Sequence, residues 1–302
     1  MNIIFLGTPD FAVPFLQSLI GSDHAPVAVV SQPDRPSGRK QEVLPTPVKA
    51  LALAHGIPVF QPDDINTPEA VKHIAALKPD LIVTVAFGQI ISQAVLDIPS
   101  YGCINVHPSL LPKYRGAIPL QEAIMHGDSE TGVSIIMMDA KMDHGPILAQ
   151  EKISMDPSET TATLREKTTV LGTKLLIQVI GHIAANTASS REQDHTQATF
   201  TRLMTRDTGK IDWSRSSHQI DCQIRALNPW PGTWTEWQGK RIKILQAQPL
   251  QALADDQEIG AFFEHSNSLI IQCGTGQLDI EKLQIEGKGP ISGSDFVKGY
   301  LS

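Results

Sequence analysis

Short apolar runs alternate with helix-like stretches through the first third of the chain, and this alternation constrains the fold more than any other feature. Each run has the length of a strand, and each intervening stretch has the apolar spacing of a helix that packs on one face. Such a series predicts a doubly wound, mostly parallel sheet with helices on both faces. The expected strands are Asn2–Gly7, Val27–Ser31, Val59–Phe60, Asp80–Phe87 and Gly102–Val106, and the expected helices are Pro9–Ile20, Pro45–Gly56, Thr67–Leu77 and Gln89–Leu96.

The pattern changes in the second half of the chain. A long helix is expected from Thr160 to about Ala185, and a polar, Ser/Thr/Gln-rich stretch follows it. At 302 residues two domains are expected, which we place at 1–188 and 207–302 with a linker at 189–206. One more helix and closely spaced short strands predict a small β-barrel in the second domain. These elements are Ser214–Leu227, Thr233–Trp237, Arg241–Gln246, Ile259–Glu264, Leu269–Gln272 and Gln277–Ile285.

Charge limits the classes of partner. The formal net charge is −7, which disfavours a protein that coats nucleic acid without sequence preference. Between Arg191 and Lys243, however, nine Lys and Arg residues face six Asp and Glu residues, a local net charge of +3. A small nucleic-acid contact in this region and an ordinary solvated surface are both compatible with this bias.

The three cysteines, Cys103, Cys222 and Cys273, form no C-x-x-C pair, which predicts reduced thiols and a cytoplasmic protein. No apolar run approaches the ~18 residues of a membrane-spanning helix, and no basic segment precedes the first strand, so neither a membrane segment nor a leader is expected. The chain lacks the glycine-rich loops that bind dinucleotides or phosphates and the histidine spacing of zinc sites. We therefore expect no metal.

Polar side chains gather at the end of one expected strand, in the run Cys103–Gly116. The two-residue period of a strand places Asn105 and His107 on the same face, at the carboxyl end where doubly wound sheets bind ligands. An Asn amide donates to a carbonyl oxygen that becomes negative, and a His donates or moves a proton near neutral pH. Capping of the strand end by the same two side chains is an equally good reading of the residues alone.

A carboxylate in a Gly/Pro loop, Asp143, follows the apolar run Val133–Met138. It is able to reach the same crevice and to keep His107 charged and oriented. Local physics favours an ordinary Asx turn at Asp143 over this functional role by about two to one. His144 has no evident partner and is expected at the surface. The long basic loop Gln32–Lys40 is either functional or a solvated excursion.

At these residues the chain resembles the methionyl-tRNA formyltransferase family over nearly its full length. The Asn-x-His set with the later Asp is similar to folate-dependent formyltransferases in general. The segments Gly7–Phe11, Gln32–Lys49 and Ile224–Gly232 correspond as well. Within them, Thr8–Phe11, Gln32–Arg39 and Asn228–Pro231 resemble the tRNA enzymes more specifically. Pro108 departs from the tRNA enzymes, where Gly or Ala is common, and is familiar in the glycinamide ribonucleotide relatives.

The resemblance implies a Rossmann-like catalytic domain joined to a C-terminal OB-like β-barrel. It also implies a cytoplasmic enzyme of translation initiation that moves the formyl group of 10-formyltetrahydrofolate to the α-amino group of methionyl initiator tRNA, without a metal. We expect a monomer. By position, the implied catalytic residues are Asn105, His107 and Asp143, the implied folate-binding residues are Ser109, Leu110, Leu111 and Pro112, and the implied tRNA-binding residues are Arg39 and Lys40.

Two other functions are compatible with parts of this pattern. A formyltransferase acting on a small amine, such as glycinamide ribonucleotide or an amino sugar nucleotide, would use the same Asn, His and Asp without an RNA contact. A folate- or RNA-binding module would use an OB-like barrel without any transfer. The convergence of three reactive side chains on one carbonyl disfavours the second of these alternatives.

Overall fold

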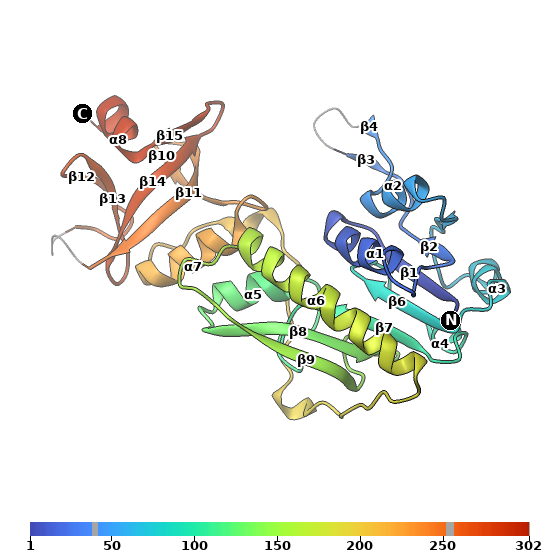
Figure 1. The fold of residues 1–302 in the computed structure, drawn as a ribbon. Coiled ribbons are helices and arrows are strands. Elements are labelled where there is room, and N and C mark those ends of the chain that lie inside the picture. Colours follow the sequence, from blue (N-terminus) through green and yellow to red (C-terminus); the bar gives the residue numbers. More distant parts are fainter. Residues whose placement is uncertain (38–41, 252–256, 302) are drawn as a thin grey trace. The chain divides into compact units, whose positions relative to one another are not determined.

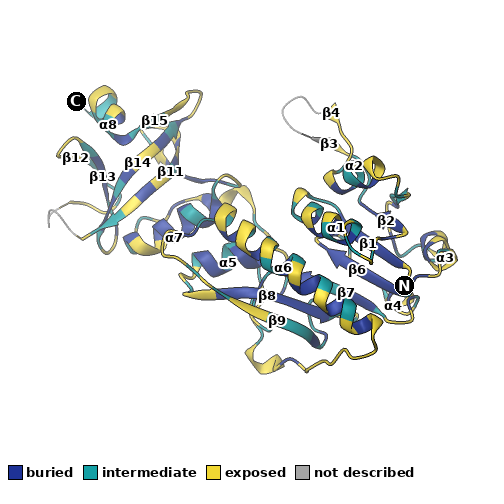
Figure 2. Ribbon diagram, in the orientation of Figure 1, coloured by how far each residue is buried: buried dark blue, intermediate teal, exposed yellow. Residues whose placement is uncertain are grey.

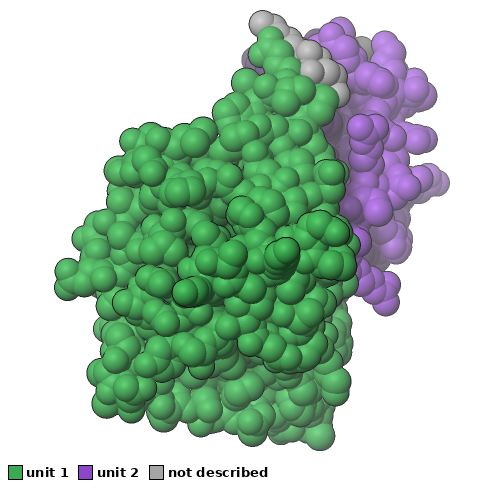
Figure 3. All heavy atoms as spheres, turned by 90° about the vertical axis from the view of Figure 1, so that its right-hand side faces the viewer, with its two compact units in different colours: residues 1–116, 131–153, 165–200 green, residues 117–130, 154–164, 201–302 purple. Residues whose placement is uncertain are grey.

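A computed structural model of the protein describes residues 1–37, 42–251 and 257–301. The chain divides into two compact units, which Figure 3 shows in different colours. The first unit comprises residues 1–116, 131–153 and 165–200, and the second comprises 117–130, 154–164 and 201–302. Both units are discontinuous in the sequence. The predicted boundaries at residues 188 and 206 stay a prediction.

The first unit is built on a seven-stranded sheet in the order β5-β2-β1-β6-β7-β8-β9 (Figure 1). The strands β5, β2, β1, β6 and β7 run parallel, and β8 runs antiparallel to β7. The predicted doubly wound, mostly parallel sheet is therefore confirmed. The strands are β1 Ile3–Gly7, β2 Ala28–Val30, β5 Val59–Phe60, β6 Leu81–Val85, β7 Cys103–His107, β8 Glu130–Met137 and β9 Ile147–Ser154. A separate two-stranded sheet pairs β3 Pro36–Ser37 with β4 Glu42–Val43.

Apolar side chains cover both faces of this sheet. One cluster packs the first face against α1, α2 and α6, and another packs the second face against α3 and α4. Figure 2 shows the central strands as almost wholly buried. Thr46 and Thr67 start α2 and α3 by accepting a hydrogen bond from a backbone N–H of the first turn. The helices are α1 Val13–Ile20, α2 Pro47–Ala54, α3 Pro68–Ala76, α4 Gln93–Leu96 and α6 Thr161–Ala184.

The second unit contains an antiparallel sheet in the order β10-β11-β14-β13-β12, with β15 paired to β14. Its apolar face forms a separate core that includes Ile244, Leu283 and Phe296. In the part of the chain that the structure describes, no pairing joins the edge strands β10 and β12, so a closed barrel is not confirmed. The elements are α5 Pro119–Met125, α7 Ser217–Leu227, β10 Thr233–Trp237, β11 Lys240–Leu250, β12 Phe262–His265, β13 Ser268–Gln272, β14 Gln277–Ile285, β15 Pro290–Ser292 and α8 Gly293–Phe296.

None of the helices within residues 1–37, 42–251 and 257–301 combines the length and the apolar character that crossing a bilayer requires. The three cysteines are free and buried. Burial raises the pKa of the Cys103 and Cys273 thiols to about 12, since it disfavours the charged thiolate.

Candidate active site

Strand β7 and the connection between β8 and β9 bring Asn105, His107 and Asp143 together. The intervening residues Ile104 and Val106 face the core on the opposite side of the sheet, so Asn105 and His107 share the other face. Asn105 Nδ2 donates to Asp143 Oδ1 at 3.1 Å. His107 Nδ1 lies 3.6 Å from Asp143 Oδ2. The three polar groups that the sequence singled out therefore meet at the carboxyl end of a central strand.

Asp143 occupies a turn that glycine makes possible. Its φ angle is +47°, in the left-handed region. Two residues later, a Cβ on Gly145 would lie 1.9 Å from the Met137 carbonyl oxygen, so no other residue fits there without a backbone shift. The backbone N–H of Gly116 donates to Asp143 Oδ2 at 2.8 Å. The carboxylate is thus held by a donor on each oxygen, and its side chain is only 11% exposed.

The ring of His107 has a fixed orientation. Its Nε2 lies 2.9 Å from the Tyr114 carbonyl oxygen, which accepts but cannot donate. Nε2 therefore carries a proton, and Nδ1 is the nitrogen that faces Asp143. The residue is 4% exposed. Only the Nδ1 edge of the ring is free to act on a bound substrate.

The residues from Ser109 to Pro112 form a tight turn beside this site. Ser109 and Leu111 are buried, and the Ser109 hydroxyl donates to the Lys113 carbonyl at 2.6 Å. Leu110 and Pro112 are half-buried. The side chains of Ser109 and Leu111 therefore shape the turn from inside, while the half-buried side chains of Leu110 and Pro112 are the parts that remain accessible to a ligand.

The two tRNA-binding residues implied by the resemblance, Arg39 and Lys40, lie outside the described residues. Residues on either side of them, including Asp34 and Lys49, are described. The Asp34 carboxylate accepts hydrogen bonds from Lys49 Nζ at 2.5 Å and from Gln61 Nε2 at 2.7 Å. These donors hold the pKa of Asp34 below its usual value, the Lys49 bond contributing most. An ion pair between Asp34 and Lys49 therefore connects the segments that precede and follow Arg39 and Lys40.

Sequence reasoning missed two buried polar residues next to Asp143, namely Arg115 and Gln193. Both are at most 5% exposed. Arg115 donates from Nε and Nη2 to Gln193 Oε1, at 3.3 and 2.7 Å. Burial lowers the pKa of Arg115, although the charges of Asp143 and Asp139 oppose that effect. Gln193 carries no sequence signal, because it sits in a stretch whose composition is that of a linker.

The expectation for His144 was wrong. Its Nδ1 lies 2.6 Å from Asp139 Oδ2, and its ring stacks on His195 with a centroid distance of 4.0 Å and an angle of 9°. The stacking on His195 was not predictable from the local sequence, since His195 comes from a segment some fifty residues later in the chain, whereas Asp139 is only five residues away and was overlooked.

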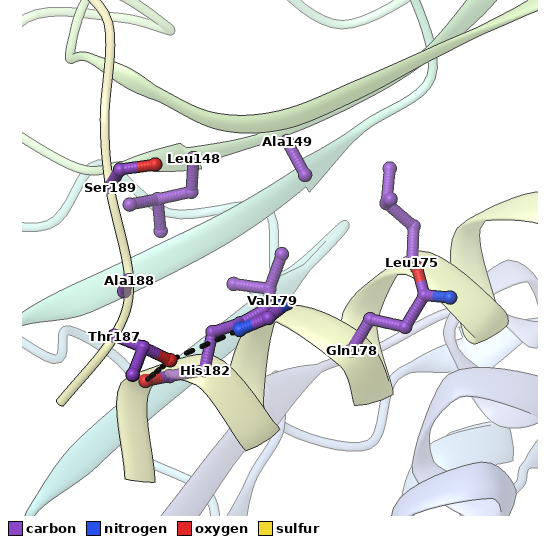
Figure 4. A pocket seen from close by; sticks show the side chains of 9 residues that line it. All are labelled: Leu148, Ala149, Leu175, Gln178, Val179, His182, Thr187, Ala188 and Ser189. Carbon is purple, nitrogen blue, oxygen red and sulfur yellow. Dashed lines mark hydrogen bonds between the residues drawn. The ribbon is translucent and has the colours of Figure 1, made fainter. Parts of the chain in front are cut away.

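A separate pocket of about 220 Å³ lies between the end of α6 and the start of β9 in the first unit (Figure 4). Its walls include Leu148, Leu175, Val179 and Ser189. The titratable residue in it, His182, uses Nδ1 to contact the Thr187 hydroxyl at 3.1 Å. None of the predicted site residues lines it. Within the described ranges, no cluster of three or more His, Cys, Asp or Glu residues is placed to hold a metal ion.

Comparisons with known proteins cover both units. Residues 1–180 match the family described as "Formyl transferase", and residues 203–301 match "Formyl transferase, C-terminal domain". The methionyl-tRNA formyltransferase of Geotalea daltonii is 44% identical over 99% of this chain and 96% of its own length. The protein of the same name from Methylococcus capsulatus is 41% identical over 99% of this chain and 97% of its own.

Two solved structures share the fold. The sugar 3N-formyl transferase WlaRD, in the presence of dTDP and 5-N-formyl-THF, has a TM-score of 0.69 and 20% identity, and the match covers 96% of this chain and 99% of that one. The N-formyltransferase of Helicobacter canadensis, in complex with folinic acid and dTDP-3-aminofucose, has the same TM-score and identity over 93% and 99%. The family matches and the full-length relatives show that this chain belongs to the methionyl-tRNA formyltransferase family.

Proposed function

We propose that this protein transfers the formyl group of 10-formyltetrahydrofolate to the α-amino group of methionyl initiator tRNA. A C–N bond forms between the amine and the formyl carbon, and the bond from that carbon to N10 of the folate breaks. The observation that carries the proposal is the convergence of Asn105 and His107 on Asp143, through a 3.1 Å hydrogen bond from Asn105 and a 3.6 Å approach of His107 Nδ1 to the carboxylate. No covalent bond to the enzyme and no metal is needed for this exchange.

Asn105 and His107 stabilise the formyl oxygen as it becomes negative. One N–H of the Asn105 amide donates to Asp143, which leaves the second N–H for the substrate. When protonated, His107 presents Nδ1–H from the same side, because Nε2–H is already bound to Tyr114. Removing one such oxyanion donor costs about 100- to 1,000-fold in rate.

Asp143 acts on the attacking nitrogen. The amine loses a proton as the new C–N bond forms, and N10 of the folate gains one as it leaves. A carboxylate fixed beside His107 is placed to accept the first proton and to orient the imidazole. Proton transfer by a positioned group is worth about 100- to 10,000-fold. Holding two bulky substrates in contact supplies a further part of the rate enhancement.

We propose that the folate lies against the turn Ser109–Pro112. Leu110 and Pro112 offer half-buried apolar surface, and Ser109 and Leu111 hold the turn in shape. The Leu111 N–H finds its partner within the fold, since it donates to the Ser134 hydroxyl oxygen at 3.2 Å. The turn is therefore rigid before any ligand arrives, which reduces the ordering cost of binding.

Two basic regions are proposed to bind the RNA. Arg39 and Lys40 contact the acceptor stem, and the basic stretch between Arg191 and Lys243 contacts phosphates through the C-terminal domain. We propose that this domain is OB-like and that the catalytic domain, linker and C-terminal domain span 1–188, 189–206 and 207–302. We also propose that the protein is cytoplasmic, since three buried free thiols suit a reducing compartment. We further propose that it is a monomer.

The decisive experiment compares three acceptors with one labelled donor. Formyl transfer from 10-formyltetrahydrofolate is measured to charged initiator tRNA, glycinamide ribonucleotide and an amino sugar nucleotide. Transfer to the tRNA alone, weakening with salt, supports the proposal. Preferential transfer to either small amine would replace it. Arg39→Ala should raise KM for charged tRNA and leave folate binding unchanged, whereas equal loss of both would contradict the role of the loop.

A further inference from the structure

The segment 191–200 packs against the candidate active site although its composition is polar. Backbone hydrogen bonds pair Arg191 with Ile147, and the Arg115 N–H donates to the Thr199 carbonyl at 2.8 Å. Most residues of the segment are exposed, but Gln193 is only 5% exposed. A buried glutamine in an otherwise exposed stretch needs partners for both ends of its amide.

The amide of Gln193 bridges a buried cation and the loop that carries Asp143. Its Nε2 donates to the carbonyl oxygens of Asp143 and Gly145, at 2.9 and 2.7 Å. Its Oε1 accepts from the Arg115 guanidinium at 2.7 and 3.3 Å. The two ends cannot exchange places, because Oε1 would then face two carbonyls and Nε2 would face a cation. Each contact thus reinforces the orientation that the other requires.

We propose that Gln193 is a positioning residue for formyl transfer, which fixes the backbone of Asp143 by coupling it to Arg115. This inference rests on the proposed function. Asp143 stands on a connection between strands and has a left-handed backbone, so the sheet alone does not determine where its carboxylate points. Reactive groups have to be held within about 0.5 Å of the productive geometry, and groups on loops depend on surrounding contacts for this.

Arg115 supplies the electrostatic part of this arrangement. It is 3% exposed, and besides Gln193 its Nη2 donates to His195 Nδ1 at 2.8 Å. A buried guanidinium polarises the amide that it contacts, which strengthens the donors at the other end of that amide. A simple truncation of Gln193 is a poor test of this role, because it would also remove the acceptor for the buried Arg115 guanidinium.

The informative substitution is therefore Gln193→Glu. The new carboxylate still accepts from Arg115, but both N–H donors to the Asp143 loop are lost and an oxygen faces two carbonyls. Gln197→Glu is the matched control, because Gln197 is an exposed residue of the same type in the same segment. Gln193→Met serves as a second variant, which adds no charge but removes the acceptor for Arg115 together with the donors.

The measurement is a single-turnover time course at saturating donor and charged tRNA. Its amplitude reports the folded, competent fraction, and its rate constant reports the geometry of each competent molecule. Both Gln193 variants should lower the rate constant about 10- to 100-fold, while Gln197→Glu matches the wild type. KM for each substrate, measured in a separate concentration series, should change less than about threefold. A reduced amplitude with an unchanged rate constant would overturn the inference, and so would wild-type kinetics.

A parallel variant separates this inference from the proposed function. Asn105→Ala should abolish most of the transfer whatever the role of Gln193. Loss of activity in Asn105→Ala with an unchanged rate constant in Gln193→Glu refutes the positioning role alone. An unchanged rate constant in both variants refutes the catalytic role of Asn105 as well, whereas absence of transfer to charged initiator tRNA by the unmodified protein refutes the proposed function itself.

Discussion

Replacing Asp143 by asparagine removes the charge of this side chain and keeps its shape. The carboxylate accepts two hydrogen bonds, from Asn105 at 3.1 Å and from the Gly116 N–H at 2.8 Å. An asparagine at this position has one oxygen, so it can satisfy only one of the two donors unless the Asn105 amide turns over. A hydrogen bond to a charged group contributes about 1.5–3 kcal/mol and a neutral one about 0.5–1.5 kcal/mol.

The expected loss in unfolding free energy is therefore about 1–3 kcal/mol, which a domain of this size tolerates. The expected loss in rate is larger. Asp143→Asn removes the proton acceptor and the partner of protonated His107, so the single-turnover rate constant should fall about 100- to 10,000-fold. Urea unfolding and a single-turnover assay at saturating substrates measure the two effects separately.

Asp139→Asn is the matched control, because Asp139 lies in the same connection and its side chain is 40% exposed. It should change the rate constant less than threefold. If Asp143→Asn folds normally and transfers formyl groups within threefold of the wild type, the carboxylate has no chemical role and the mechanism is wrong.

Three further predictions concern stability and reactivity. The hydrogen bond from Lys49 lowers the pKa of Asp34. The ionised carboxylate therefore stabilises the fold above the unfolded pKa of about 3.9, and this stabilisation is lost as the pH falls through the lower pKa of the folded state. Between about pH 5 and strongly acid pH, the unfolding free energy of Asp34→Asn, measured with urea, should therefore fall less than that of the wild type. Among the described residues, the Thr84 hydroxyl is buried without a hydrogen-bond partner, so Thr84→Val should raise the unfolding free energy by about 1 kcal/mol, and a loss would contradict this. Burial raises the pKa of Cys103 and Cys273 to about 12, so the native protein should react with Ellman's reagent at pH 8 far more slowly than the unfolded chain, which exposes all three thiols.

The parallel strands were predictable because their burial is nearly complete. The run Asp80–Phe87 contains β6, whose five residues are all buried, and the predicted bounds of β10 and β14 agree with those observed. Strand β9, Ile147–Ser154, was not predicted, because at the edge of the sheet most of its side chains are half-buried or exposed. An edge strand lacks the apolar run on which such predictions depend. The long strand β11, which lies between β10 and β14, was predicted only as far as Gln246, because the residues that follow it alternate without an apolar run.

The candidate site was predictable only in part. Asn105 and His107 share a face because of the period of a strand, which local sequence reveals. The approach of Asp143 depends on how β8 and β9 are connected, and local physics favoured an isolated turn. Gln193 was not predictable at all, since burial of a polar side chain is decided by tertiary contacts some fifty residues away in sequence. The resemblance supplied the first of these long-range relations and not the second.

Asp143 lies on a connection between strands, so its position depends on contacts from other parts of the chain. Asn105 and His107 take their positions from β7, which pairs with strands on both sides. Asp143 has no such frame, and its position results from the Gly116 N–H, the Asn105 amide and the bridge from Gln193. All three of these groups lie outside the β8–β9 connection and at least 27 residues from Asp143 in sequence. Substitution of Gln193, the buried residue of the segment 191–200, should therefore alter the rate of transfer without touching either substrate, whereas substitution of the exposed Gln197 should not.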